Sequence, residues 1–467
     1  MNELYPRRLA NSFMHLTPSG AFVLAKGTPK DPIWTWMLEK VDEFNADLLL
    51  ISNGTRELAD ITDILQKKYR LSKDEVEHRV RSSLEFAQWK NLLILDNEPY
   101  RLGNYRVTGS KEYFVPMHMH VETTDMCNFE CIHCYRESGP RSKEVIDCDK
   151  LEGALELLSS MGLRIVELTG GEPLLHPQIK KIIDFCLDKF NIVALITNGY
   201  FLDEEFIKYF ADAFASRKMF VSVSCNSYDA EFHDKFTNVK GSWDRATKAI
   251  RMLGEVGALS RFAMNIVPDN MDHLEKTVEF AQSIGAFSFT FSPIMPFGRG
   301  VNIDWSKVSQ EKFSQFEKIQ NKIAKDYGRF VFTIPEELMV NVKNAHCGAG
   351  QSSFALSPKG FLRPCVSASE DLFNFGNIFD RPTEEILSNS ITMVLDQITA
   401  PNSAACSDCK FEHFCNRCWY RGVIASQQVE LCRWLQCTPL KEQIRDISAL
   451  KNLSELSNLD KYHSIKG

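Results

Sequence analysis

Short apolar segments alternate with segments of helical periodicity between about residues 112 and 295. The candidate strands are residues 117–125, 164–171, 192–199, 220–227, 261–267 and 286–294. This alternation predicts an α/β fold with a parallel sheet and right-handed crossovers. Six units are too few for a closed eight-fold barrel, so we expect a partial (β/α)6 barrel. A further helix is expected to begin near Ser309.

The pattern over residues 32 to 106 is different and predicts a small mixed domain. Apolar residues at helical spacing predict helices over 55–70 and 72–91, and Ser72 and Glu75 form a capping-box pattern at the start of the second. Residues 33–54 predict an apolar first helix, and residues 92–102 a strand–turn–strand wing. Helices followed by a wing predict a winged helix. Neither long helix carries a strong basic stripe, which argues against a DNA-binding role.

Composition and charge limit the classes of function. A chain of 467 residues is expected to form two or three domains. Its net charge of −7 gives no support to nucleic-acid binding. It has no apolar run near the ~20 residues of a membrane span, and its polar N-terminus does not resemble a signal peptide. We therefore expect a soluble cytoplasmic protein with no nucleic-acid or membrane partner.

Fourteen cysteines in such a protein are expected to be reduced, and those at regular spacing to bind metal. Cys148, Cys186 and Cys225 stand apart from any ligand spacing, and we interpret them as buried or incidental thiols.

Three cysteines, Cys127, Cys131 and Cys134, follow the first candidate strand. A closed zinc site needs four ligands, so three thiolates on one loop favour an iron–sulfur cluster with one iron free. Other unusual residues also follow strands, where the functional groups of such sheets gather. They are Gly170 to Pro173, Thr197 to Gly199, Ser224, Asn226 and Ser292–Pro293. His118 and His120 share one face of the first strand, and we expect buried barrel residues there rather than metal ligands.

The C-terminal region has a second group of cysteines. They are Cys347, Cys365, Cys406, Cys409, Cys415, Cys418, Cys432 and Cys437. Taken alone, the paired cysteines two residues apart suit either zinc or iron–sulfur clusters. One alternative is therefore a zinc-binding winged-helix regulator. The colour of the anaerobically purified protein distinguishes an iron–sulfur enzyme from a zinc-binding regulator, because an iron–sulfur protein is brown and a zinc protein is colourless.

The Cys127–Tyr135 segment resembles the motif of the radical S-adenosylmethionine (SAM) enzymes. The resemblance implies a [4Fe–4S] cluster on Cys127, Cys131 and Cys134, whose free iron chelates SAM, and cleavage of SAM to a deoxyadenosyl radical. Gly170, Gly171 and Glu172 resemble the family's element for the methionine amino group. Asn198, Ser224 and Asn226 match positions that contact the SAM ribose or carboxylate, although the family commonly has an acidic residue near position 226. Tyr135 is expected to shield the cluster or to lie near the adenine.

The C-terminal cysteines resemble the SPASM extension, which implies two auxiliary [4Fe–4S] clusters and three clusters in all. Carried over, Cys347, Cys365 and Cys418 hold the first auxiliary cluster. Cys406, Cys409, Cys415 and Cys432 hold the second. The last pair of the central block is spaced by two residues where the family usually has three. Cys437 is additional, and it either completes the first auxiliary cluster or is free.

The chain as a whole, from about residue 40 to 435, resembles the maturases of ribosomally made sactipeptides, whose N-terminal domain captures a leader peptide. The segments that carry this resemblance are VPMHMHVETTDMCNFECIHCY, ELTGGEPLLHP, ALITNGYF, PFGRG, HCGAGQSSFALSPKGFLRPC and FGNIF. It implies thioether bonds from cysteine sulfur to carbon, expected at an α-carbon, in a cysteine-containing precursor peptide. It also implies an external electron donor such as flavodoxin or ferredoxin. Alternative reactions are a thioether to a β or γ carbon, a carbon–carbon crosslink and the oxidation of a residue to formylglycine. The N-terminal domain argues against formylglycine formation.

These patterns predict four regions. They are a leader-recognition domain at 1–108, a radical SAM barrel at 112–330, a SPASM domain at 340–440 and a tail at 441–467 that we assign no chemistry.

Overall fold

The computed structural model describes most of the chain. The described residues are 4–9, 12–25, 37–100, 106–294, 297–305, 308–331, 347–370, 373–401, 403–407, 409, 415, 418–426 and 432–438. The chain divides into two compact units, residues 1–115 with 387–393, and residues 116–386 with 394–467. The expected tail at 441–467 lies outside the described residues, and the predicted domain boundaries remain predictions.

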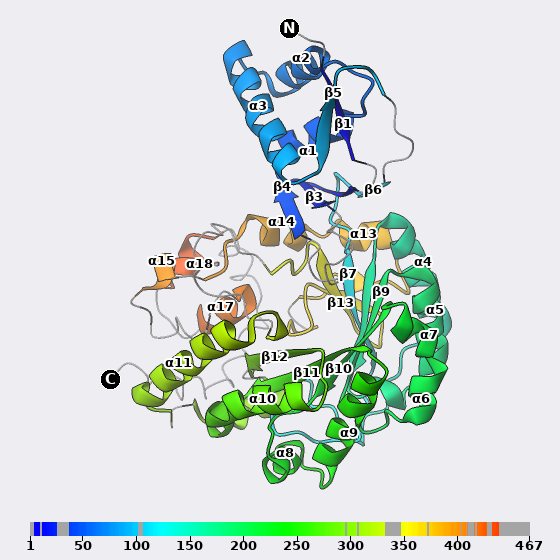
Figure 1. The fold of residues 1–467 in the computed structure, drawn as a ribbon, viewed down its shortest axis with the longest axis vertical. Coiled ribbons are helices and arrows are strands. Elements are labelled where there is room, and N and C mark those ends of the chain that lie inside the picture. Colours follow the sequence, from blue (N-terminus) through cyan, green and yellow to red (C-terminus); the bar gives the residue numbers. More distant parts are fainter. Residues whose placement is uncertain are drawn as a thin grey trace. The chain divides into compact units, whose positions relative to one another are not determined.

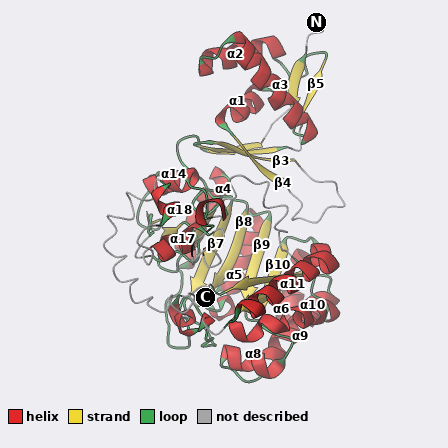
Figure 2. Ribbon diagram, turned by 90° about the vertical axis from the view of Figure 1, so that its left-hand side faces the viewer, coloured by secondary structure: helices red, strands yellow, loops and turns green. Residues whose placement is uncertain are grey.

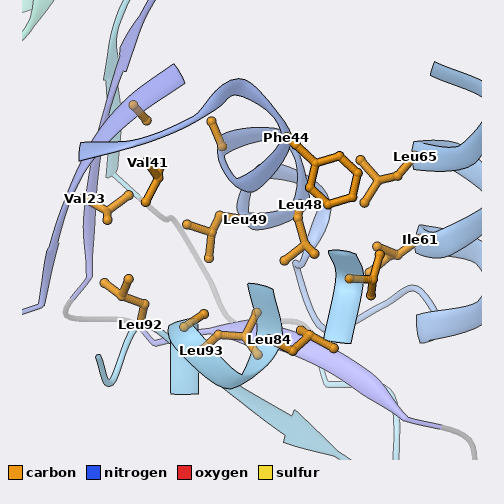
Figure 3. Close-up of a cluster of buried hydrophobic side chains, with 14 of the residues drawn as sticks. Val23, Val41, Phe44, Leu48, Leu49, Ile61, Leu65, Leu84, Leu92 and Leu93 are labelled. Atoms are coloured by element: carbon orange, nitrogen blue, oxygen red, sulfur yellow. The ribbon is translucent and has the colours of Figure 1, made fainter. Parts of the chain in front are cut away.

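The first unit contains three helices and two small sheets. The helices are α1 (Glu43–Ile51), α2 (Leu58–Tyr69) and α3 (Lys73–Trp89), and the strands are β1 (Tyr5–Arg8), β2 (Phe13–Thr17), β3 (Gly20–Ala25), β4 (Met37–Val41), β5 (Leu93–Asp96) and β6 (Arg106–Gly109). One sheet has the order β4-β3-β2-β6, and β1 pairs with β5 in the other. Side chains from α1, α2 and α3 pack with Val23, Val41, Leu92 and Leu93 in one apolar core (Figure 3).

The capping box predicted at the start of α3 is confirmed. Ser72 Oγ accepts a hydrogen bond from the Glu75 amide, and the Glu75 carboxylate accepts one from the Ser72 amide at 2.9 Å. Two other predictions for this unit are wrong. Residues 37–41 of the expected first helix form β4, because β3 supplies an antiparallel ladder that local spacing does not show. Within the expected wing only β5 is a strand. It pairs with β1, far away in the sequence, and residues 101–102 lie outside the described part of the chain.

The second unit is built on six parallel strands whose order in the sheet follows the chain (Figure 1). They are β7 (His118–Thr124), β8 (Ile165–Gly170), β9 (Ile192–Thr197), β10 (Met219–Ser224), β11 (Leu259–Ile266) and β12 (Ser288–Pro293). The helices between them are α4 (Cys148–Met161), α5 (Ile179–Lys189), α6 (Glu204–Tyr209), α7 (Ala211–Ala215), α8 (Ala230–Thr237), α9 (Ser242–Glu255) and α10 (Leu274–Ser283), and α11 (Gln310–Tyr327) follows. All six predicted strands and the parallel α/β arrangement are confirmed.

Helices cover one face of this sheet (Figure 2). Met119, Val121, Val166 and Leu168 are fully buried, and they alternate along β7 and β8 with polar residues. Because successive side chains of a strand point to opposite faces, the polar residues line the face away from the helices. Functional side chains are therefore expected on that face and at the carboxyl edge.

The cysteine-rich region extends the same sheet. β13 (Ser353–Leu356) pairs in parallel with β7, and it continues into β14 (Phe361–Arg363) and β15 (Gly376–Asn377). The helices of this region are α13 (Thr383–Leu387), α14 (Ser390–Gln397), α15 (Ser403–Cys406), α17 (Trp419–Ser426) and α18 (Arg433–Gln436). Short 3-10 helices lie at Pro173–Leu175, Pro268–His273, Gly298–Asn302 and Gly328–Phe330. In the described part of the chain, no helix combines the length and the apolar character needed to span a membrane.

Candidate functional site

The three predicted cluster cysteines lie on the loop that leaves the carboxyl end of β7. Cys127 begins this loop, and its amide donates to the Gly139 carbonyl at 3.2 Å. The Cys134 amide donates to the Cys131 carbonyl at 3.3 Å, which closes a turn between the last two cysteines. All three are free thiols. The loop therefore presents three sulfur ligands next to the end of a parallel strand.

A segment distant in sequence fastens this loop. The Arg299 guanidinium donates to the carbonyls of Cys131 (2.8 Å) and Ser138 (2.9 Å), and the Arg299 amide donates to the Cys134 carbonyl at 3.0 Å. The neighbouring Gly298 has φ +52°, and a Cβ there would lie 2.6 Å from the Cys134 carbonyl oxygen. In the sequence, the PFGRG segment served only as part of the resemblance, and these contacts of Arg299 with the cluster loop, here called the Arg299 clamp, were not predicted. The adjacent Gly298 and Arg299 are the feature of the sequence that could have indicated them.

Gly170 and Gly171 allow the end of β8 to pack closely against the cluster loop. A Cβ at Gly170 would lie 2.3 Å from the Thr124 carbonyl oxygen, and one at Gly171 would lie 2.2 Å from that of Met126. The Gly171 and Glu172 amides donate to these same two oxygens, each at 2.7 Å. The glycines therefore allow the close backbone packing of the loop, and a role for Gly170 and Gly171 in SAM binding remains a prediction.

The Glu172 carboxylate joins the ends of β8 and β9. It is fully buried and accepts hydrogen bonds from the Leu174 amide (3.1 Å), the Thr197 hydroxyl (2.7 Å) and the Asn198 amide (2.8 Å). The Asn198 side chain in turn donates to Asn128 on the cluster loop at 2.9 Å. Burial raises the pKa of Glu172 to about 7, against the opposing effect of these three donors. A role for Glu172 and Asn198 in SAM binding remains a prediction.

Ser224 and Asn226 lie at the end of β10 and just beyond it. Asn226 is buried, and its side-chain oxygen accepts from the Asn265 amide at 3.0 Å. Asn265 also lies 3.1 Å from His133 Nε2 through its own side-chain nitrogen. His133 stands between two cluster cysteines, and its buried Nδ1 has no hydrogen-bond partner among the described residues. Sequence reasoning missed Asn265 and His133. SAM contacts at Ser224 and Asn226 remain predictions.

Beside the loop lies a buried group of charges. Glu122 of β7 is fully buried and forms ion pairs with Arg136, next to Tyr135, and with Arg363 of β14. Burial and the Glu122 carboxylate raise the pKa of Tyr135. The structure therefore places Tyr135 beside this charged group. Because Arg363 lies two residues before Cys365, Glu122 connects the first cysteine loop to the second cysteine region.

Seven of the C-terminal cysteines lie near one another in two sets, around Cys365 and around Cys415, and their assignment to two auxiliary clusters remains a prediction. Burial, followed by the neighbouring Cys418 and Cys347 thiols, raises the pKa of Cys365 to about 12. Burial and the thiols of Cys406, Cys409, Cys432 and, more weakly, Cys418 raise the pKa of Cys415. Each Cys-x-x-Cys pair is a turn, with the second amide 2.8 Å from the first carbonyl. Cys437 is exposed after α18, and its part in the first auxiliary cluster remains a prediction.

The thiols suit iron–sulfur clusters chemically. Burial raises the pKa of Cys127 to about 12 and raises that of Cys131 as well, whereas Arg299 opposes both shifts. Metal binding requires thiolates and releases their protons, so iron would compensate for this burial. Cys148, Cys186 and Cys225 are buried, as predicted.

His118 and His120 differ from expectation. They are partly exposed, at 28% and 20% of their side-chain surfaces, and His120 Nδ1 lies 2.9 Å from Glu167 Oε1. The expectation of buried residues at these two positions is therefore wrong.

Comparison with known families agrees with this geometry. The radical SAM superfamily matches residues 121–281, and the iron–sulfur cluster-binding SPASM domain matches residues 347–419. The first match spans β7 to α10 and the cluster loop, and the second begins at Cys347. The chain therefore belongs to the radical SAM enzymes that carry a SPASM domain, and its cofactors include iron–sulfur clusters and SAM.

Within this class, the chain groups with ribosomal-peptide maturases. It is 30% identical over 372 residues to the antilisterial bacteriocin subtilosin biosynthesis protein AlbA of Bacillus subtilis, covering 79% of this chain and 81% of AlbA. The sporulation killing factor maturation protein SkfB of the same organism is 23% identical over 75% of this chain and 82% of SkfB. The SAM-bound structure of Streptococcus suis SuiB aligns with a TM-score of 0.59 at 14% identity, covering 92% of this chain and 98% of SuiB, which supports the fold alone.

Proposed function

We propose that this enzyme forms thioether crosslinks, from cysteine sulfur to an α-carbon, in a ribosomally made precursor peptide. The observation that carries the proposal is the nearness of the Cys347 and Cys418 thiols to Cys365 and of the Cys406, Cys409 and Cys432 thiols to Cys415, with Cys418 also near the second set. Three thiols leave one iron of a four-iron cluster without a protein ligand. A substrate thiolate suits that position, because coordination to a metal keeps it deprotonated.

The similarity to AlbA and SkfB supports a peptide substrate, because both names describe the biosynthesis or maturation of a peptide product. Another structure of SuiB, with the same TM-score, holds its precursor peptide SuiA. In this proposal the first unit binds the leader of the precursor, and the loop of Cys127, Cys131 and Cys134 acts on its core. We further propose a cytoplasmic enzyme that receives electrons from a flavodoxin or ferredoxin.

The chain's residues have separate tasks in this reaction. When bound, the cluster on the first loop and SAM supply a radical that removes one hydrogen atom from the peptide. Glu172, Asn198, Ser224 and Asn226 orient SAM at the strand ends. Joining sulfur to carbon releases one further electron and the thiol proton. Cys406, Cys409, Cys415 and Cys432 would hold the second auxiliary cluster, which would supply an acceptor for that electron.

Cysteine variants test the assignment. Three clusters predict about twelve irons per chain in the wild type. We expect Cys365→Ala to lose roughly four of them, to retain SAM cleavage and to lose crosslinking. Cys148→Ala is the matched control, because Cys148 is a buried thiol outside both cysteine regions. Crosslinking by Cys365→Ala at the wild-type rate would refute a role for this group.

A further inference from the structure

A compact polar group of two histidines and one glutamate lies on β7 and β8. His118 and His120 are on β7, and Glu167 is opposite His120 in the parallel register. All three point to the sheet face away from the helices, because the alternate residues Met119 and Val166 are fully buried. His120 is four residues before the end of β7, a distance of ~13 Å along the strand at ~3.3 Å per residue. The group is therefore separate from the cluster loop.

The three side chains offer a convergent set of ligand atoms. One nitrogen of each histidine and one oxygen of Glu167 all lie within 4.8 Å of one another. His118 Nε2 is 3.8 Å from Glu167 Oε2, too far for a hydrogen bond, and this buried nitrogen has no hydrogen-bond partner among the described residues. Ligands of a tetrahedral zinc ion at ~2.0–2.1 Å lie roughly 3.4 Å apart. Small side-chain rotations therefore bring the three atoms to zinc geometry.

The charge state of the group also suits a metal. Burial and the neighbouring His120 lower the pKa of His118 to about 4, so this imidazole is neutral at physiological pH. Burial raises the pKa of Glu167, but His120, His118 and Arg261 outweigh it and lower that pKa to about 2. A neutral imidazole and an ionised carboxylate are the forms that bind divalent cations.

Arg261 is an unfavourable neighbour for a cation at these three residues. It donates to Ser222 at 3.0 Å and contributes a positive charge on the same face of the sheet. This charge weakens cation binding at the site.

We propose that His118, His120 and Glu167 form a binding site for one divalent transition-metal ion of the zinc class, independent of the iron–sulfur clusters. Two imidazoles and one carboxylate are a common protein ligand set for zinc, and they leave a fourth position for water or an anion. The partial exposure of all three side chains gives an ion access to the site. The ion would join β7, which leads to the cluster loop, to β8, which leads to Gly170 and Gly171.

Zinc binding by the iron-loaded enzyme tests this site, because its clusters occupy the cysteines. The holoenzyme is dialysed anaerobically against micromolar zinc, and zinc and iron are measured by mass spectrometry. We expect the wild type to hold one more zinc per chain than His118→Gln and Glu167→Gln, at equal iron content. His78→Gln, at an exposed position of α3, is the matched control and should bind zinc as the wild type does.

Zinc-edge X-ray absorption identifies the ligands of the extra ion. The proposal predicts a shell of nitrogen and oxygen at ~2.0–2.2 Å without sulfur at ~2.3 Å. Equal zinc in the wild type and in both variants would overturn the proposal, as would a sulfur shell. Two variants are used so that a folding defect in one, seen as lost iron or an altered circular dichroism spectrum, leaves the other informative. Failure here leaves the proposed thioether chemistry unaffected, because that chemistry is read from peptide products.

Discussion

Removing the Arg299 guanidinium should disable the first cluster while preserving the other two. Arg299→Ala deletes the hydrogen bonds to the Cys131 and Ser138 carbonyls and keeps the one from its own amide to Cys134. A hydrogen bond from a charged donor contributes ~1.5–3 kcal/mol, so the two together are worth at most about 3–6 kcal/mol. Water replaces part of this, and we expect a net loss of about 2–4 kcal/mol in the stability of the closed loop.

At ~1.4 kcal/mol per factor of ten, this loss raises the open fraction of the loop roughly 30- to 700-fold. The assays are iron content, the SAM-dependent change in the electron paramagnetic resonance spectrum of the reduced enzyme, and formation of 5′-deoxyadenosine. We expect the loss of roughly four irons per chain, of the SAM-dependent signal and of SAM cleavage, with the auxiliary signals retained.

Arg141→Ala is the matched control, since this arginine lies on the same loop with 94% of its side chain exposed and a single contact at 3.7 Å to Glu130. Arg299→Lys keeps the charge and loses the two-pronged donor geometry, so it should fall between the wild type and the alanine variant. Wild-type SAM cleavage and spectra in Arg299→Ala would refute the clamp.

Three further predictions concern the same region. Gly171→Ala places a Cβ 2.2 Å from the Met126 carbonyl oxygen and should abolish SAM cleavage, measured as formation of 5′-deoxyadenosine. Gly153→Ala is the control and should cleave SAM as the wild type does, because a Cβ at Gly153 meets open space. Glu122→Gln leaves the buried Arg363 without its carboxylate partner, while Arg136 keeps its ion pair with Asp125, and should cost about 3–5 kcal/mol, seen as a lower apparent melting temperature. Burial raises the pKa of Glu172 from 4.5 to about 7, so its contribution to stability is present at pH 4.5 and is lost as pH rises through 7. Melting temperatures between pH 5 and 8 should therefore fall more steeply in the wild type than in Glu172→Gln, and equal slopes would contradict this.

The barrel was predictable because each of its strands is a short apolar run between helical segments. Carboxyl ends of parallel strands share one edge, so the positions of Cys127, Gly171 and Asn198 followed from the same pattern. The first unit was less predictable, since β4 and β5 pair with strands distant in sequence and local spacing does not encode such partners.

Side-chain roles were harder to predict than positions. The two glycines of the Gly170–Glu172 element approach backbone carbonyls of the cluster loop, which only the packed structure shows. Arg299 acts from more than 160 residues away in the sequence. Glu167 lies next to the two histidines because the parallel register of β7 and β8 places it beside His120. The sequence of neither strand alone contains this register.

The central claim is that this enzyme joins a cysteine sulfur to an α-carbon of a precursor peptide, and product mass spectrometry tests it most directly. The reduced holoenzyme is incubated with SAM and a short cysteine-containing precursor that retains its leader. Each crosslink should lower the peptide mass by two hydrogens, and fragmentation should place the new bond between a cysteine sulfur and an α-carbon. A peptide of unchanged mass, despite SAM cleavage, would contradict the account, as would a β or γ thioether or a carbon–carbon bond.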